Sequence, residues 1–294
     1  MSQGFMVHAY NNCDIDYGLL ALCCCLLIKK HLAVNNTVLI SSEDTLDWLQ
    51  QTQDHDLIDY AFDYIKITDR NWSIPTRQFN DTQYTVNTVL YDIESRFNSF
   101  TLTPFDETIL LDADFLILDQ SIDTIWGCKE DLLINKKIID LNLNQTTGKE
   151  FAARFNKMRI TRYWSSIMYF KMTTQVQSLF ELTKFIKENY PDFQMFHNSG
   201  TTEWCSFDSC LSVAIHMLNS QLEIDNIKPF SVQPLLTATE MNNFIDFRES
   251  CAVFTNENHY EDSPVYKVSS NVHVMNKWAM LRMSDRIIKY ARPV

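Results

Sequence analysis

Short apolar runs alternate with longer segments in which apolar residues recur at a helical period. The apolar runs predict strands at residues 4–10, 37–41, 63–67, 107–111 and 164–170. The periodic segments predict helices at residues 17–31, 43–51, 84–97, 174–189, 207–218 and 279–291, and residues 271–275 predict a short strand or loop. Because strands and helices alternate over the first 115 residues, we expect an α/β fold with a mixed, parallel-centred sheet flanked by helices.

Polar residues mark the start of two of these helices. Asp14 or Asp16 can accept hydrogen bonds from the free N–H groups of the helix at 17–31, and Ser206 is placed to cap the helix at 207–218. The longest apolar run, residues 19–28, has about half the length that a bilayer-spanning helix needs. We therefore expect a buried helix there and no transmembrane segment.

The cysteines and the first residues bear on the expected compartment. Three of the eight cysteines are consecutive, at positions 23–25, and the others lack the spacing of a metal site, so we interpret them as reduced core thiols. No basic stretch leads into an apolar one at the N-terminus, so no secretory signal is predicted. The expected location is the cytoplasm.

A pair of aspartates follows the most apolar of the predicted strands. Asp112 and Asp114 come directly after residues 107–111, a run typical of a strand covered on both faces. If the extended conformation persists, both carboxylates lie on one side, where a hard divalent cation would relieve their repulsion. The alternative is a pair of solvated or capping aspartates at a strand end. The other Asp-x-Asp pairs, at 14/16 and 54/56, do not follow such a strand.

Glycine and charge restrict the kinds of ligand. There are only five glycines, and none form the Gly-rich loops that cradle phosphates, so a bound diphosphate would need a cation or basic side chains. The net charge of −12 disfavours nonspecific attraction to nucleic acid or anionic membranes. Residues 136–162, however, carry seven basic and two acidic side chains, and residues 277–294 carry five and one. Both segments are candidates for contact with a polyanion.

Two segments carry a resemblance to a known family. The order strand, polar turn, helix, followed by P-F-D-E-T-I-L-L-D-A-D-F-L-I-L at 104–118, resembles the nucleotide-sugar-binding half of GT-A-fold glycosyltransferases. The segment N-V-H-V-M-N-K-W at 271–278 is similar to the His-x-x-Gly-x-x-Lys-Pro-Trp signature of retaining, glycogenin-like and lipopolysaccharide galactosyltransferase-type enzymes. It departs from that signature because the glycine and proline are missing and Lys277 lies earlier than the signature's lysine.

The resemblance implies a GT-A (Rossmann-like) fold and a set of site residues. It implies one domain over 1–294, with a nucleotide-sugar half at 1–118, an acceptor half at 119–278 and a basic amphipathic helix at 279–294. The implied ligands of Mn²⁺ or Mg²⁺ are Asp112, Asp114 and His273. The implied donor contacts are Ala9, Tyr10, Asn12 and Tyr17 around the base and ribose, with Arg96, Asp112, Ala113, Asp114 and Lys277 near the diphosphate and sugar. Asp208 and Glu203 would face the donor sugar and the acceptor as catalytic residues.

The implied activity is metal-dependent transfer of a sugar from a nucleotide diphosphate, above all a UDP-sugar, to a hydroxyl. In a retaining enzyme the leaving phosphate itself can accept the proton of the acceptor. In an inverting enzyme Asp208 or Glu203 is the candidate base. Two other classes stay open: a non-catalytic protein that binds nucleotide or metal, and a sugar nucleotidyltransferase, although the glycine-rich loop of the latter is absent after Tyr10.

The acceptor has several interpretations. The basic span 136–162 has Phe151, Phe155, Tyr163 and Trp164 in or beside it, a mixture suited to phosphate contacts and base stacking. The chain also resembles phage-encoded glycosyltransferases, active in the host cytoplasm, that modify hydroxymethylated pyrimidine bases in DNA. Alternatively, the final helix presents Arg282, Arg286 and Lys289 on one face and could lie on an anionic membrane while a glycolipid or saccharide is modified. A solvated basic face on a packed helix explains the same pattern.

Overall fold

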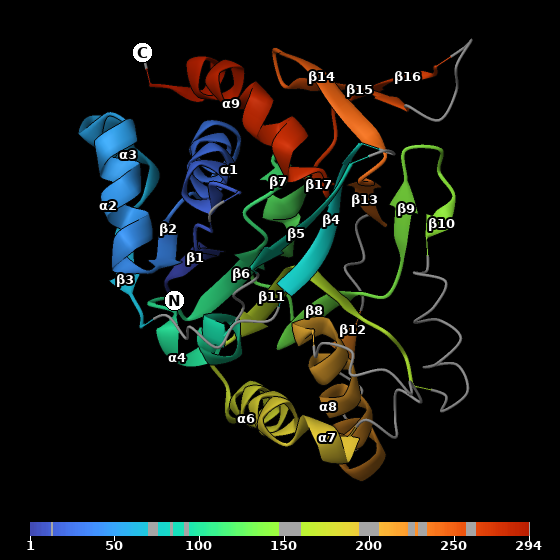
Figure 1. Ribbon diagram of the computed structural model, residues 1–294. Helices are drawn as coiled ribbons and strands as arrows, with labels where there is room; N and C mark the ends of the chain where they lie inside the picture. The colour runs from blue at the N-terminus through green and yellow to red at the C-terminus, as the bar shows by residue number, and fades with distance from the viewer. Residues whose placement is uncertain are drawn as a thin grey trace.

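A seven-stranded mixed sheet is the centre of the computed structural model (Figure 1). The structure describes residues 1–12, 14–69, 76–82, 85–90, 94–146, 160–193, 206–222, 227–228, 234–256 and 263–293. The strand order is β12 (Ile227–Lys228), β8 (Leu132–Asn135), β11 (Trp164–Lys171), β6 (Glu107–Leu111), β1 (Gln3–Ala9), β2 (Thr37–Ser41) and β3 (Tyr64–Ile67). Strands β6, β1, β2 and β3 are parallel, and β11 runs antiparallel to β6 and β8. The expected parallel-centred α/β sheet is confirmed.

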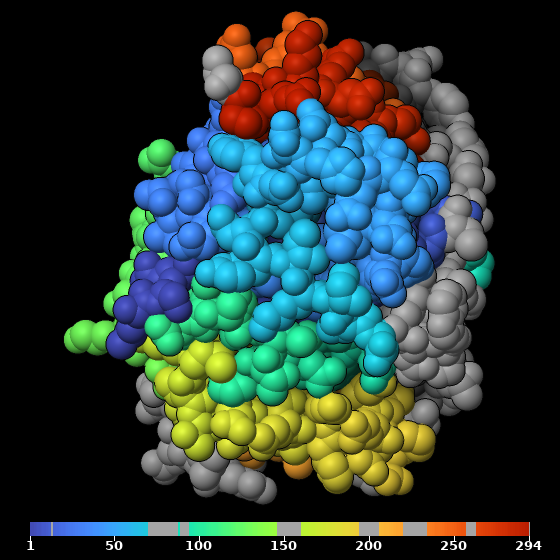
Figure 2. Space-filling model, turned by 90° about the vertical axis from the view of Figure 1, so that its left-hand side faces the viewer, coloured from blue at the N-terminus to red at the C-terminus, as the bar shows by residue number. Residues whose placement is uncertain are grey.

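Helices cover both faces of this sheet. One face carries α1 (Tyr17–His31), α2 (Glu43–Thr52), α3 (His55–Ala61) and α9 (Lys277–Ala291). The other carries η1 (Glu94–Asn98), α4 (Ser99–Leu102), α6 (Thr174–Glu188), α7 (Tyr190–Phe193) and α8 (Phe207–Leu222). Neighbouring strand residues alternate between the two cores, since Ile109 and Leu111 join one and Leu110 the other. In Figure 2, α2 and α3 form the exposed side, with α9 above them and α4 and α6 below.

A smaller sheet lies beside the carboxyl end of β6. Its order is β10 (Gln145–Thr146), β9 (Ile138–Asp140), β13 (Leu235–Ala238), β17 (Val272–Val274) and β7 (Phe115–Leu116), and η2 (Ser121–Ile125) follows β7. A three-stranded sheet of β14 (Asn242–Arg248), β15 (Cys251–Asn256) and β16 (Val265–Val268) packs beside α9. Because β7 follows β6 and pairs with β17, residues 112–114 connect the two larger sheets.

The predicted helix at 84–97 is wrong. The structure has a hairpin of β4 (Thr76–Thr82) and β5 (Thr85–Leu90) there, followed by the 3₁₀ helix η1. The reason is local, because Thr85, Val86, Thr88 and Val89 are β-branched and favour an extended backbone.

The structure identifies the N-caps of two predicted helices. Asp16, rather than Asp14, caps α1 by accepting a hydrogen bond from Leu19 N. Asn276 caps α9 by accepting one from Ala279 N, so that helix starts at Lys277 and not at residue 279.

The apolar face of α9 is buried inside the protein. Met280, Ile287 and Ala291 are fully buried where the helix packs against α1 and β14. Arg286 pairs with Asp246 of β14. The amphipathic pattern of the last helix is therefore explained by packing in the core. Among the described residues, no helix has the length and apolar character needed to span a bilayer.

Candidate functional site

The loop after β6 is held in place by both neighbouring sheets. All five residues of β6 are buried, and the strand ends at Leu111. The backbone N–H of Asp112 donates to Ser166 O of β11 at 2.9 Å, and Val274 N of β17 donates to Asp114 O at 2.9 Å. These two hydrogen bonds place both aspartates at the carboxyl edge of the central sheet, where ligands of open α/β sheets bind.

Asp112, Asp114 and His273 form a three-ligand group suited to a metal ion. One ligand atom of each lies within 4.8 Å of the others. His273 Nε2 is 3.2 Å from Asp114 Oδ1 and 3.5 Å from Asp112 Oδ2, yet it is buried and neither contact has hydrogen-bond geometry. A buried imidazole nitrogen facing two carboxylates is a donor set that divalent cations accept, so the residues present fit a metal.

The imidazole ring is oriented by its surroundings. Phe115 stacks against the ring of His273 with centroids 6.2 Å apart. Thr237 Oγ1 lies 3.4 Å from His273 Nδ1, on the side of the ring opposite the carboxylates. These contacts direct Nε2 towards the aspartates, as the outer contacts of a metal-bound histidine usually do.

Two basic side chains pair with the same aspartates. Lys277 Nζ lies 2.7 Å from Asp114 Oδ2, and both side chains are at least 90% buried. Arg96, which is 8% exposed, pairs with Asp112 Oδ1 and donates to Ser165 O. Arg96 therefore belongs to the site and does not lie on a solvated helix face.

The charges of the cluster shift the pKa values of its members. Burial alone would raise the pKa of Asp114, but the positive charges of Lys277 and His273 outweigh burial and hold it well below its usual range. Burial would likewise lower the pKa of His273, but the carboxylates of Asp114 and Asp112 outweigh it and raise the pKa above its ordinary value. Asp114 is thus ionised at neutral pH although it is buried.

Asp208 is linked to this cluster through Ser165. The carboxylate of Asp208, in the first turn of α8, accepts hydrogen bonds from Ser165 N, at 2.8 Å, and from Ser165 Oγ. The carbonyl of the same serine accepts from Arg96, which pairs with Asp112. Glu203 lies outside the described residues.

Ser165 and Ser166 are site residues that the sequence analysis missed. A signal was present, because two consecutive serines follow Trp164 at the start of a largely apolar strand. There the pairing of β11 with β8 is irregular, so that Trp164 pairs with Asn135 and Met168 with Ile134. In this bulge Ser166 accepts a hydrogen bond from the backbone N–H of Asp112, and Ser165 contacts Arg96 and Asp208.

The residues expected around a base and ribose lie at the end of β1 and the start of α1. Ala9 O accepts a hydrogen bond from Ser41 Oγ, and Tyr10 OH is 2.6 Å from Thr68 Oγ1. Asn12 Oδ1 accepts from the N–H groups of residues 14 and 15. Tyr17 is the first residue of α1. These positions share the sheet edge of Asp112, and their contact with a nucleotide stays a prediction.

The basic segment is described at its two ends only. Lys136 Nζ lies 5.7 Å from the ring centroid of Tyr163, and the guanidinium carbon of Arg162 lies 4.0 Å from that of Trp164. These are cation–π contacts within the protein. Phe151 and Phe155 lie outside the described part of the chain.

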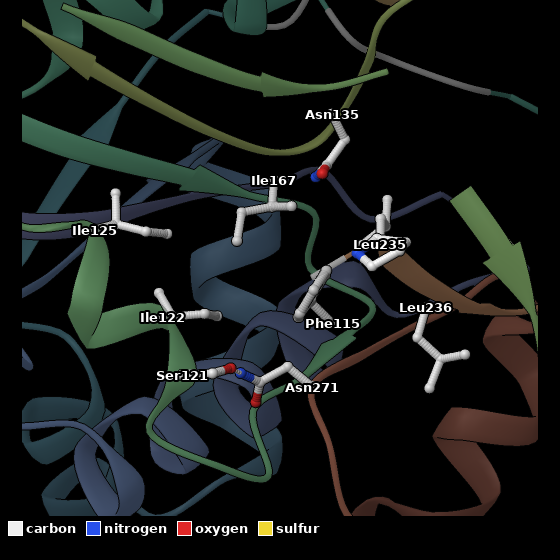
Figure 3. Close-up of a pocket in the computed structure, with 10 residues that line it drawn as sticks. Phe115, Ser121, Ile122, Ile125, Asn135, Ile167, Leu235, Leu236 and Asn271 are labelled. Carbon is white, nitrogen blue, oxygen red and sulfur yellow. Dashed lines mark hydrogen bonds between the residues drawn. The ribbon is translucent and has the colours of Figure 1, made fainter. Parts of the chain in front are cut away.

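A small pocket lies beside Phe115, the residue that follows Asp114 (Figure 3). Its volume is about 50 Å³, and Asn135 directs its amide towards an otherwise mostly apolar lining that includes Phe115, Ile167 and Leu235. The lining contains none of the metal-cluster residues. This pocket is therefore separate from the candidate metal site.

Comparisons with known proteins concern the fold. No family model and no curated protein sequence match the chain. Among solved structures, the glycosyltransferase GlyE of Streptococcus pneumoniae matches the chain with 9% sequence identity and a TM-score of 0.44. The match covers 79% of this chain but only 45% of GlyE, so the chain spans less than half the length of that protein. The galactosyltransferase LgtC in complex with donor and acceptor sugar analogues shares 11% identity over 99% of this chain and 97% of LgtC, with a TM-score of 0.48. An active-site mutant of LgtC shares 10% identity over the same coverage, with a TM-score of 0.51. The chain therefore has the GT-A-like α/β fold of the glycosyltransferase LgtC.

Proposed function

We propose that the protein is a glycosyltransferase that uses a divalent cation, Mn²⁺ or Mg²⁺, and a nucleotide diphosphate sugar, above all a UDP-sugar. The observation that carries the proposal is the group of Asp112, Asp114 and His273 at the carboxyl end of β6. The fold supports it, because LgtC has been solved with donor and acceptor sugar analogues. A fold alone does not specify an activity, so the proposal depends on the chemistry of these residues.

In the reaction, the bond between the anomeric carbon and the diphosphate oxygen breaks, and the acceptor oxygen forms a bond to that carbon. Asp112, Asp114 and His273 would hold the cation, which when bound supplies positive charge to the departing diphosphate. Lys277 and Arg96 add preorganised positive charge beside it, where negative charge develops.

The remaining groups are proposed to accept the acceptor's proton and to orient the sugar. The resemblance is to retaining enzymes, in which the leaving phosphate accepts the acceptor's proton. Asp208, held by two hydrogen bonds from Ser165, then orients the donor sugar and acceptor. In an inverting reaction, Asp208 or Glu203 would be the base.

One proposed acceptor is a hydroxymethylated pyrimidine base in DNA. Trp164, the first residue of β11, and Arg162, two residues before it, offer an aromatic ring and a cation near Ser165. A saccharide or glycolipid acceptor is the alternative. Because the apolar face of α9 is buried in the protein, this helix would contact a membrane only through its exposed basic side chains.

The experiment is a screen of nucleotide-sugars with Mn²⁺ that measures release of free nucleoside diphosphate, with hydroxymethylated DNA and saccharides as acceptors. We expect Asp112→Asn to reduce turnover by at least about 100-fold, because it removes a carboxylate that would hold the cation, whose positive charge stabilises the departing diphosphate. The matched control is Asp56→Asn, which changes an exposed Asp-x-Asp pair at the start of α3 and keeps full activity. Full activity of Asp112→Asn would refute the proposed function.

A further inference from the structure

Each aspartate of the metal cluster turns one carboxylate oxygen towards His273 and the other towards a cation of the protein. For Asp112, Oδ2 lies 3.5 Å from His273 Nε2, whereas Oδ1 pairs with Arg96. For Asp114, Oδ1 lies 3.2 Å from that nitrogen, whereas Oδ2 lies 2.7 Å from Lys277 Nζ. Each carboxylate that would bind a metal ion is therefore already paired with a positively charged side chain, Asp112 with Arg96 and Asp114 with Lys277.

The charges of these four side chains balance before any ion binds. The exposed fractions are 10% for Arg96 and 24% for Asp112, and 10% for Lys277 and 5% for Asp114. Water therefore screens the charges poorly. A divalent cation would add two positive charges to this group, in which both carboxylates are already paired with a basic side chain. Repulsion from Arg96 and Lys277 therefore opposes its binding.

We propose that Arg96, together with Lys277, makes divalent-cation binding conditional on a nucleoside diphosphate. The inference rests on the proposed function and deepens it, because the diphosphate is the anion that restores the charge balance. The coupling is reciprocal, so cation and diphosphate raise each other's affinity by the same factor. Arg96 acts on the cation through Asp112 and is a positioning residue.

A merely structural role for Arg96 predicts the opposite result. If Arg96 served only to orient Asp112, its removal would weaken cation binding by about 10- to 100-fold, as loss of an outer contact usually does. If its charge opposes the cation, its removal strengthens binding. Repulsion is the larger effect here because the guanidinium pairs directly with a carboxylate that would bind the cation, in a mostly buried site.

The test is isothermal titration of the whole protein with Mn²⁺ alone, without nucleotide. We expect Arg96→Gln to bind Mn²⁺ at least about tenfold more tightly than the unmodified protein. The matched control, Arg292→Gln, removes the same charge from an exposed pair with Asp54, about 22 Å along α9 from Lys277, and leaves the affinity unchanged. Equal or weaker Mn²⁺ binding by Arg96→Gln would overturn the inference.

A second measurement needs no variant. In the unmodified protein, we expect UDP to raise the affinity for Mn²⁺ at least about tenfold, measured by thermal shift over a matrix of both concentrations. Mn²⁺ that binds equally well with and without UDP would also overturn the inference. The proposed function fails separately: if no nucleotide-sugar is consumed, the tighter Mn²⁺ binding of Arg96→Gln still stands. Conversely, turnover with an unchanged Mn²⁺ affinity of that variant refutes only the role of Arg96.

Discussion

Replacing Lys277 by methionine tests how strongly the buried ion pair stabilises the metal-free protein. The substitution keeps an unbranched, largely apolar side chain of comparable length but removes the ammonium group that lies 2.7 Å from Asp114 Oδ2. With 10% and 5% of the two side chains exposed, Asp114 would be left as a buried carboxylate, and His273 would be its one remaining ion-pair partner among the described residues.

The expected loss in free energy of unfolding is about 3–5 kcal/mol, the usual result of removing one partner of a buried pair. That is a large part of the roughly 5–15 kcal/mol by which a domain is stable. The control is Arg292→Met, because Arg292 and Asp54 are 53% and 46% exposed. Arg292→Met should lower the free energy of unfolding by less than about 1 kcal/mol, since exposed ion pairs contribute little to stability.

The assay is urea unfolding with EDTA at pH 7, for the single variants and for the double variant Lys277→Met with Asp114→Asn. Because the neutral amide needs no counter-charge, the double variant should be more stable than Lys277→Met alone. A loss for Lys277→Met no larger than that for Arg292→Met would refute the reasoning. So would a double variant whose loss equals the sum of the single losses.

Two further predictions concern stability away from the metal cluster. Burial, helped by the charge of Arg96, holds the pKa of His8 well below its usual value, so only the unfolded chain takes up this proton as the pH falls below about 6.5. The stabilisation from neutral His8 is therefore complete above that pH and is lost below it. Between pH 6.5 and 5, the free energy of unfolding should fall less steeply in His8→Gln than in the unmodified protein, by up to about 1.4 kcal/mol per pH unit, as measured by urea unfolding. An unchanged slope would contradict this. In the two-residue turn between β14 and β15, Glu249 and Ser250 have φ of 46° and 61°. Because Asn and Gly adopt positive φ more readily, replacing the two residues by Asn and Gly should raise the free energy of unfolding by about 1 kcal/mol, measured by calorimetry. No gain in stability would count against backbone strain in this turn.

Local sequence was informative where one segment determines its own environment. The apolar run of β6 predicted a strand buried on both faces, and the structure buries all five of its residues. The aspartates that follow it lie at the expected sheet edge because the strand direction alone places them there. The helix predicted at 84–97 was wrong because its β-branched residues favour an extended backbone, and this part of the chain forms β5, which pairs with β4.

The partners of the aspartates are set by tertiary contacts that no local pattern reports. His273 reaches them because β17 pairs with β7, and only the resemblance to a family signature indicated it. The burial of Arg96 and its pairing with Asp112 depend on how η1 packs beside β11. Ser165 and its bond to Asp208 depend on the bulge in β11, which the sequence marks only by two serines.

The central claim is that Asp112, Asp114 and His273 hold a divalent cation for a nucleotide-sugar. The most direct test is anomalous diffraction from crystals grown with Mn²⁺ and UDP. We predict a manganese peak bounded by these three side chains, with the diphosphate in contact with the ion. A map with UDP bound but no manganese among the three residues would contradict the claim.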